Sequence, residues 1–215
     1  PVLELEGFQI GAVTGVQGMS WEEYIVKGMS NHAGTTPMHL RHDAGYGASA
    51  IALAARNLAL AMGGNQVATV GTIQLKPGLV NVIAKEARLT VDLRNTDETR
   101  LQQAEADMTT RIEAIARAEG LEISSRSLAR FEPVVFAPDM IELVTKTARE
   151  LGLSVKSMPS GAGHDAGLIA AMAPTAMIFV PSANGISHNV QEYTAPKELE
   201  NGANVLLHVL LQLVM

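Results

Sequence analysis

The sequence predicts an α+β domain built on an antiparallel sheet, followed by part of an α/β domain. From Ser20 to Phe136 the hydrophobic pattern changes between period 2 and period 3.6 in the order β-α-β-β-α-β, which is typical of a split βαβ sheet with two helices on one face. After Phe136 a helical pattern is followed by the apolar run TAMIFVPS, which does not alternate and therefore indicates a strand covered on both faces.

Strands are predicted where polar and apolar residues alternate or where a short apolar run occurs. Residues 8–27 are expected to hold two strands around a turn at Gly18. Further strands are expected at residues 66–75, 86–95, 121–136 and 175–182, the first two of them joined by a KPG turn.

The two helices of the first domain have recognisable ends. Asp43 can cap a helix over residues 43–64, which is rich in Ala and Leu and ends in a pair of glycines. Thr96 can cap a helix over residues 96–120, with acidic residues in its first turn and Gly120 closing it.

The last part of the chain follows a different pattern. A helix is expected over residues 138–153, then a glycine-rich loop at residues 159–168, the apolar strand, and a final helix from about Lys197. A single α-β-α piece cannot complete a sheet that is covered on both faces, so we expect this part to be the tail of a larger α/β domain.

Composition limits the classes of function. The 215 residues include no cysteine, which excludes disulfides and thiolate chemistry and fits a reducing compartment, so we expect a cytoplasmic protein. The formal net charge is −6 and no run of Lys and Arg occurs, so neither nucleic acid nor a membrane is an expected partner. No GxGxxG follows a strand, and there is no P-loop and no GxSxG elbow, which argues against nucleotide-binding proteins and serine hydrolases.

Three histidines lie close together in SNHAGTTPMHLRHD. No Cys or carboxylate pattern completes a metal site with His32, His39 and His42. His32 stands beside a small residue and a glycine, which leaves its ring room to project. It is either a functional histidine or one that is merely hydrogen-bonded within the loop.

Asn81 and Arg94 stand on either side of a strand turn. Arg94 ends the alternating segment TVDLRN, and its planar guanidinium suits a carboxylate. An ordinary salt bridge of Arg94 with Asp92, Asp97 or Glu98 explains the pattern equally well.

Two segments of the second domain also carry candidate residues. In PSGAGHDAG, Gly163 and His164 precede an expected helix start, where backbone N–H groups favour an anionic or carbonyl oxygen. His188 follows the apolar strand, and ligand sites in open α/β sheets lie at the carboxyl ends of strands. By contrast, Glu22 and Glu23 are expected to point to opposite faces of one strand, and we interpret them as structural.

The motifs PVLE, SNHAGTTPM with RHDAG, NV followed by DLRN, SGAGHDA and GISHN together resemble the M20-type metal-dependent amidohydrolases. Within that family they are most similar to the carbamoylase branch, which comprises N-carbamoyl-L-amino acid hydrolases, β-ureidopropionases and allantoate amidohydrolases. The resemblance implies three parts: residues 1–17 as a residual catalytic-domain strand and linker, residues 18–136 as a ferredoxin-like dimerisation (lid) domain, and residues 137–215 as the C-terminal part of a zinc-peptidase-like α/β catalytic domain.

The resemblance also implies roles for individual residues. His188 matches the last zinc ligand, and His32 matches a lid histidine that reaches into the partner subunit's active site and polarises the scissile carbonyl. Asn81 and Arg94 match residues that hold the substrate carboxylate, while Gly163 and His164 match a loop that contacts the substrate.

The implied reaction is hydrolysis of the ureido C–N bond of an N-carbamoyl amino acid, which gives the amino acid, ammonia and carbon dioxide. The implied cofactors are two divalent metal ions, zinc or else Mn, Co or Ni, and the implied assembly is a homodimer formed through the lid domain. The implied substrate is a small ureido compound that bears a carboxylate.

The sequence departs from the family pattern in two places. Ala84 and Lys85 follow NVI where the family commonly has Pro-Gly, so the turn beneath Asn81 is expected to differ. The family's first histidine, bridging aspartate, Glu-Glu pair and the histidine just ahead of PVLE have no counterparts here. We therefore expect the chain to be the C-terminal half of such an enzyme, with one metal ligand of its own and no activity alone.

Three alternatives stay open. An allantoate amidohydrolase would share the same carboxylate-binding residues, and an M20 metallopeptidase would cleave a peptide bond instead. A non-catalytic dimerisation module would pair through the 96–120 helix or an exposed sheet edge and would bind neither metal nor ligand.

Overall fold

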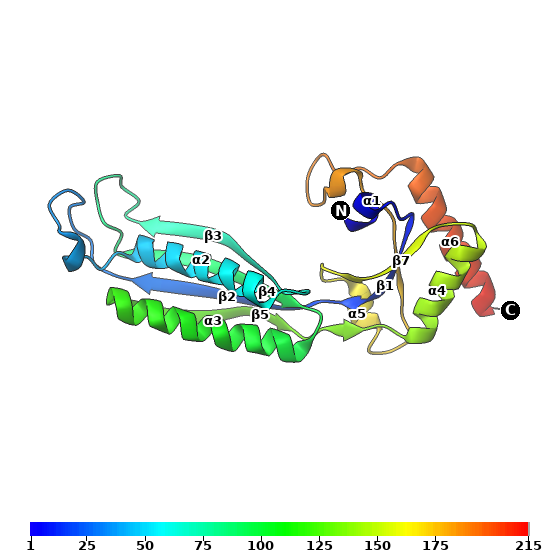
Figure 1. The fold of residues 1–215 in the computed structure, drawn as a ribbon, viewed down its shortest axis with the longest axis horizontal. Coiled ribbons are helices and arrows are strands. Elements are labelled where there is room, and N and C mark those ends of the chain that lie inside the picture. The colour runs from blue at the N-terminus through cyan, green and yellow to red at the C-terminus, as the bar shows by residue number, and fades with distance from the viewer. Residues whose placement is uncertain (215) are drawn as a thin grey trace. The chain divides into compact units, whose positions relative to one another are not determined.

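The structure is a computed structural model that describes residues 1–214, and the chain forms two compact units. One unit joins Pro1–Gln17 to the part of the chain that starts at Val134, and the other is Gly18–Pro133 (Figure 1). Both units are mixed structures of helices and open sheets, as the sequence predicts. Because the chain leaves the first unit and returns to it, Gly18–Pro133 is an insertion within that unit.

The inserted unit has the order β-α-β-β-α-β that the sequence predicts. Its elements are β2 (Gly18–Lys27), α2 (Ala44–Met62), β3 (Val67–Lys76), β4 (Glu86–Asn95), α3 (Glu98–Glu119) and β5 (Glu122–Phe131), with the short 3₁₀ turn η1 (Met38–Leu40) after β2. The sheet order is β3-β4-β2-β5, and every neighbouring pair of strands is antiparallel. The strands β3 and β5 are therefore the two edges of this sheet.

One face of this sheet and both helices share a single hydrophobic core. Alternate residues of β4, such as Leu89 and Val91, pack with Ile51 of α2 and Leu101 of α3. The other face of the sheet carries polar side chains, among them Glu23, which pairs with arginines of the strands on either side. Glu22 and Glu23 thus point to opposite faces, as predicted.

The caps of the two helices agree with the sequence in part. Asp43 caps α2 as predicted, because its carboxylate accepts hydrogen bonds from the N–H groups of Gly45 at 2.9 Å and Tyr46 at 3.2 Å. The prediction that Thr96 caps α3 is wrong, because the carboxylate of Asp97 accepts from Arg100 N–H at 2.9 Å. An aspartate one residue later reaches the third helical N–H, and it is the stronger cap of the two.

Gly18 does not form the predicted turn. It begins β2, whereas β1 ends two residues earlier at Val16 and belongs to the other sheet. Glycine is required at this position because a Cβ there would lie 2.6 Å from Cδ of Pro133. Pro133 also interrupts the strand that was predicted to continue to residue 136, since proline has no N–H to give to a ladder.

The first unit is built around a central strand. Its elements are α1 (Val2–Glu6), β1 (Ile10–Val16), β6 (Val134–Val135), α4 (Pro138–Glu150), β7 (Val155–Ser160), α5 (Asp165–Ile169), β8 (Met177–Phe179), the 3₁₀ turn η2 (Ala183–Gly185) and α6 (Pro196–Val214). Strand β1 pairs with β7 in parallel and with β6 and β8 antiparallel. Residues 1–17 therefore contain the central strand of this sheet, because every other strand of the sheet pairs with β1.

The predicted domain boundary after Phe136 lies three residues too late. Val134 and Val135 pair with Val16 and Gly15 of β1, and the N–H of Phe136 donates to the carbonyl of Thr14 at 3.0 Å. Strand β7 was not predicted at all, since residues 155–158 received no assignment and residues 159–160 were placed in the glycine-rich loop. Strand β8 is present but covers only Met177–Phe179 of the predicted apolar run.

The sheet of the first unit is covered on both faces, as the apolar run predicts. Ile178 packs with Val144 of α4 and Val205 of α6, whereas Met177 and Phe179 pack on the other side with a cluster that includes Ala166 of α5. Among residues 1–214, no helix is long and apolar enough to cross a lipid bilayer.

Candidate functional site

The structure brings His32 and Asn81 together. His32 forms an isolated antiparallel bridge with Val82, and the N–H of Ala33 donates to the carbonyl of Asn81 at 3.0 Å. The loop after β2 and the loop between β3 and β4 are thus joined by backbone hydrogen bonds in the unit Gly18–Pro133.

The hydrogen bonds of the His32 ring define which nitrogen carries its proton. Its Nδ1 accepts from the N–H groups of Gly34 at 3.0 Å and Thr35 at 3.3 Å, so in the neutral ring the proton belongs on Nε2. The loop is held by Thr36, whose hydroxyl donates to the His32 carbonyl at 2.8 Å, and by Arg41, whose guanidinium donates to the Ala33 carbonyl at 2.6 Å. His32 therefore presents an exposed N–H donor on a fixed backbone.

Arg94 is engaged by a carboxylate of its own strand. Its Nε lies 3.0 Å from Oδ1 of Asp92 and its Nη2 lies 2.7 Å from Oδ2, and the guanidinium stacks 5.9 Å from the ring centre of Trp21. Of the salt bridges that the sequence left open, the one with Asp92 is formed. Asp97 instead caps α3, and Glu98 pairs with Arg130.

Arg94 and Asn81 do not share one site within a single copy of the chain. Asn81 precedes the start of β4 at Glu86, and Arg94 is the second-last residue of that strand. At the rise of an antiparallel strand, Glu86 and Arg94 are about 27 Å apart. The two residues that were predicted to hold one carboxylate therefore lie toward opposite ends of β4.

In the first unit, His164 is the N-cap of the short helix α5. Its Nδ1 accepts from the N–H of Ala166 at 3.2 Å, so the imidazole itself takes up a free N–H of the helix start that was predicted to bind a ligand. Gly163 and His164 are both exposed and follow the end of β7.

His188 lies in the loop between η2 and α6, with a backbone φ of 57°. Its N–H donates to Oε2 of Glu192 at 2.9 Å, and its side chain is exposed. Because β8 runs antiparallel to β1 whereas β7 runs parallel, the loops that carry His188 and His164 leave this sheet at opposite ends. His164 and His188 each follow the carboxyl end of a strand, but the two strands run in opposite directions, so the two histidines are not brought together.

The described residues do not form a complete metal site. In the stretch 1–214, no three His, Cys, Asp or Glu side chains are placed to hold a metal ion. His188 offers a single imidazole, and a catalytic zinc takes three protein ligands.

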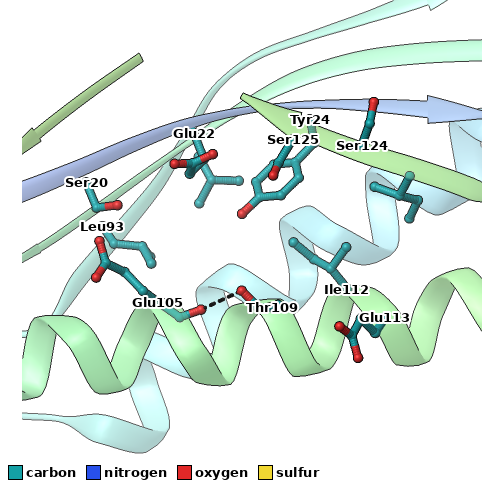
Figure 2. A pocket seen from close by; sticks show the side chains of 12 residues that line it. Ser20, Glu22, Tyr24, Leu93, Glu105, Thr109, Ile112, Glu113, Ser124 and Ser125 are labelled. Atoms are coloured by element: carbon teal, nitrogen blue, oxygen red, sulfur yellow. Dashed lines mark hydrogen bonds between the residues drawn. The ribbon is translucent and has the colours of Figure 1, made fainter. Parts of the chain in front are cut away.

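A cavity between β2, β5 and α3 was not predicted from the sequence (Figure 2). Ser20, Glu22 and Tyr24 enter it from alternate positions of β2, on the face that also carries the core residue Val26. Polar residues at two core-facing positions of a strand were the signal that could have indicated it.

Comparisons with known proteins place the chain in a family. The model of the peptidase family M20/M25/M40 matches residues 4–212. Over 212 residues, 99% of the chain, the sequence is 36% identical both to an N-carbamoyl-L-amino-acid amidohydrolase of Rhizobium meliloti and to an allantoate amidohydrolase of Escherichia coli. A crystal structure of a hydantoinase/carbamoylase family amidase from Burkholderia multivorans superposes with a TM-score of 0.95 at 40% identity over 99% of the chain.

The fold and the motifs therefore point to one family. The chain belongs to the peptidase family M20/M25/M40, which confirms the resemblance seen in the sequence. It spans about half the length of these relatives, covering 51% of the Rhizobium protein and 52% of the Escherichia and Burkholderia proteins.

Proposed function

We propose that the chain supplies a lid domain and the C-terminal part of the catalytic domain to an amidohydrolase that cleaves the ureido C–N bond of an N-carbamoyl amino acid. The products are the amino acid, ammonia and carbon dioxide. The relative from Rhizobium meliloti, an N-carbamoyl-L-amino-acid amidohydrolase, supports this substrate class. The observation that carries the proposal is the fixed ring of His32.

His32 is suited to polarise a carbonyl group. Because Gly34 and Thr35 donate to Nδ1, the exposed Nε2–H can donate to the oxygen of a carbamoyl carbonyl. When a nucleophile attacks that carbonyl, negative charge develops on the oxygen, and a donor that is already oriented stabilises the transition state more than the ground state.

A homodimer accounts for the separation of the carboxylate-binding residues. Since Asn81 and Arg94 lie toward opposite ends of β4, one copy would supply His32 and Asn81, and the partner copy would supply Arg94. Arg94 already pairs with Asp92, so a substrate carboxylate would have to share or replace that partner.

A specific surface of the lid domain supports pairing. Tyr46, Leu53 and Leu60 are spaced by seven residues along α2, and each is more than half exposed. They form an apolar stripe beside the edge strand β3, which itself exposes Ile73 and Leu75. This α2 stripe is a better pairing surface than the 96–120 helix, whose exposed positions are mostly polar or charged.

His188 would contribute one ligand to a metal centre completed by residues outside the described chain. The M20 pattern places a metal-binding histidine just ahead of PVLE, and in the structure Pro1 packs so closely on Gly185 that a Cβ there would overlap it. Gly185 is three residues from His188, so these two segments are neighbours in the first unit. When bound, divalent ions lower the pKa of a coordinated water and so supply a nucleophile.

The test is an activity assay on a chimera in which the N-terminal half of the Rhizobium meliloti amidohydrolase precedes Pro1. His32→Ala is expected to lower kcat for an N-carbamoyl-L-amino acid about 100-fold or more, as for removal of one oxyanion donor. His39→Ala, a control in the same loop, is expected to leave kcat unchanged. An equal kcat for the His32→Ala chimera and its parent would refute the role of His32.

Allantoate is the second candidate substrate, because the relative from Escherichia coli is an allantoate amidohydrolase with the same identity to the chain. The ratio of kcat/KM for the two substrates in the chimera distinguishes them. A higher kcat/KM for allantoate, or for a dipeptide, would replace the N-carbamoyl amino acid as the substrate class.

A further inference from the structure

The cavity between β2, β5 and α3 has no role in the proposed reaction. It has a volume of about 270 Å³ and lies wholly within the unit Gly18–Pro133. Its lining consists of Ser20, Glu22, Tyr24, Val91, Leu93, Glu105, Thr109, Ile112, Glu113, Ile123, Ser124 and Ser125. None of the candidate catalytic, substrate-binding or metal-binding residues is among them.

Two hydroxyl groups that line this cavity belong to largely buried residues and have no protein partner. Tyr24 is 8% exposed and Ser20 is 4% exposed, and neither hydroxyl forms a hydrogen bond with any residue of the described chain, 1–214. Figure 2 shows the Tyr24 hydroxyl pointing from β2 toward α3, with the Glu22 side chain on the same strand nearby. Because both hydroxyl groups line the cavity, they are free to form hydrogen bonds with a ligand or water that fills it.

Glu22 carries the uncompensated charge of the cavity. It forms no ion pair with the residues that the structure describes, whereas its neighbour Glu23, on the opposite face of the sheet, lies 3.1 Å from Arg126 and 3.7 Å from Arg88. The other carboxylates of the lining have partners. Glu105 lies 2.7 Å from Arg130, and Glu113 lies 3.6 Å from Arg117.

The protonation of Tyr24 agrees with a negative environment. Burial, together with the charges of Glu22 and Glu105, raises the pKa of Tyr24 to about 12. The hydroxyl therefore stays neutral at physiological pH and can accept a hydrogen bond from a cation. Ile112 of α3 and Ile123 of β5 add apolar surface to the same space.

We propose that this cavity binds a small primary alkylammonium ion. The ammonium group has three N–H donors, which the carboxylate of Glu22 and the hydroxyls of Tyr24 and Ser20 match as acceptors. The short alkyl chain contacts Ile112 and Ile123. A bare divalent cation fits less well, because no three carboxylate or imidazole side chains of residues 1–214 converge here or elsewhere.

The test is a titration of the 215-residue chain with n-butylammonium chloride, followed by ¹H–¹⁵N correlation spectra, with n-butanol as the uncharged analogue of the same length. Saturable shifts confined to the cavity segments of β2, β5 and α3 are expected for the amine and not for the alcohol. Equal binding of n-butanol, or no saturable shift, would overturn the proposal.

Two variants decide whether the charge that binds the amine is Glu22. Glu22→Gln is expected to weaken butylammonium binding at least about tenfold, because it removes a charged hydrogen bond. Glu23→Gln removes the same charge from the same strand on the other face and is expected to change the affinity less than about twofold. Tyr24→Phe, which keeps the ring, is expected to weaken binding by several-fold.

Each remaining outcome counts against the proposal. Equal weakening by Glu22→Gln and Glu23→Gln would show that the amine responds only to the net charge of the chain. Displacement of the amine by millimolar MgCl₂ at constant ionic strength would show a site for inorganic cations. Unaltered binding in the Glu22→Gln and Tyr24→Phe variants, with their far-ultraviolet circular dichroism unchanged, would place the amine elsewhere.

Discussion

The Nδ1 atom of His42 lies 3.1 Å from the carbonyl oxygen of Glu119, the last residue of α3. The next residue, Gly120, has a φ of +61°, and a Cβ on it would lie 2.7 Å from the His42 ring. One histidine, placed just before α2, thus covers the C-terminal end of α3. An imidazole that donates to a terminal carbonyl satisfies an acceptor that the helix leaves free.

The substitution Gly120→Ala is expected to destabilise the chain by about 2–4 kcal/mol, since it adds both a left-handed backbone penalty and a clash with His42. Gly7→Ala is the matched control, because Gly7 ends α1 in the same left-handed conformation, with φ 73° and ψ 27°, but a Cβ added there would have no atom within 4 Å. The control should cost only about 1 kcal/mol. Urea denaturation measures both free energies of unfolding, and equal losses would show that contact with His42 contributes nothing.

Arg130 joins β5 to α3 through two carboxylates. Its Nη2 lies 2.5 Å from Glu98 and its Nε lies 2.7 Å from Glu105, and the second oxygen of Glu98 is buried without a partner among the described residues. Arg130→Ala removes the ion pair of both partly buried carboxylates, although Glu98 still accepts from Gln102, so a loss of about 1–3 kcal/mol in unfolding free energy is expected. Arg117→Ala removes only an exposed i,i+4 pair with Glu113 and should cost less than about 0.5 kcal/mol. A loss for Arg130→Ala no larger than that for Arg117→Ala would contradict this role.

The apolar stripe on α2 allows the proposed homodimer to be tested. Leu60 is 68% exposed and Leu53 is 58% exposed, so a glutamate at either position does not disturb the core. We expect Leu53→Glu and Leu60→Glu to raise the dimer dissociation constant at least about 100-fold, because each would bury a charge in the interface. Sedimentation equilibrium measures the constant.

Leu128→Glu serves as the control for this experiment, since Leu128 is an exposed leucine of the other edge strand, β5. It is expected to leave the dimer intact. Dissociation by Leu128→Glu alone would move the interface to the β5 edge, and a monomeric parent chain would remove pairing through the α2 stripe from the proposal.

The sequence predicted the inserted unit well because its signals are local. Alternation marks the strands, and the caps at Asp43 and Gly120 mark helix ends, so the element order follows directly. The errors there are small shifts, such as Thr96 for Asp97, where two adjacent residues can both cap a helix and geometry decides between them.

The first unit was harder to predict because its strands depend on partners far away in the chain. Strand β7 has half-buried residues without alternation and a proline within VKSMPS, so it carries no local signal and forms by pairing with β1 about 145 residues earlier. The antiparallel direction of β8 is likewise a property of the sheet and not of its residues. That direction separates the His164 and His188 loops, which sequence order alone could not show.

The candidate site residues likewise include some whose surroundings are local in sequence and some whose surroundings depend on distant parts of the chain. The hydrogen bonds that orient His32 run within a tight loop, so its neighbours Gly34 and Thr35 were visible in the motif. The position of Arg94 relative to Asn81 depends instead on the length of β4, and the cavity at Glu22 depends on how α3 lies across β2. Spacing in sequence carries no information on either relationship.

Tyr24 gives the cavity a measurable pH dependence. Its folded pKa is about 12, raised mainly by burial and further by the charges of Glu22 and Glu105, whereas an unfolded tyrosine titrates near the ordinary value of 10.0. Between these two values the unfolded chain holds fewer protons at this residue than the folded chain. The stability that Tyr24 contributes is therefore complete below pH 10 and is lost as the pH rises through 12, by up to about 3 kcal/mol.

Tyr24→Phe should abolish this part of the pH dependence, so the unfolding free energies of parent and variant should converge or cross between pH 10 and pH 12 in urea titrations. Glu22→Gln removes one of the charges that raise the pKa of Tyr24, so this pKa should move down toward 10. The ionisation of Tyr24 is followed as the difference in absorbance at 295 nm between proteins with and without Tyr24. A parallel pH dependence for parent and Tyr24→Phe would mean that the hydroxyl ionises as freely in the folded chain as in the unfolded one. In that case neither burial nor the charge of Glu22 would hold the Tyr24 hydroxyl in its neutral form.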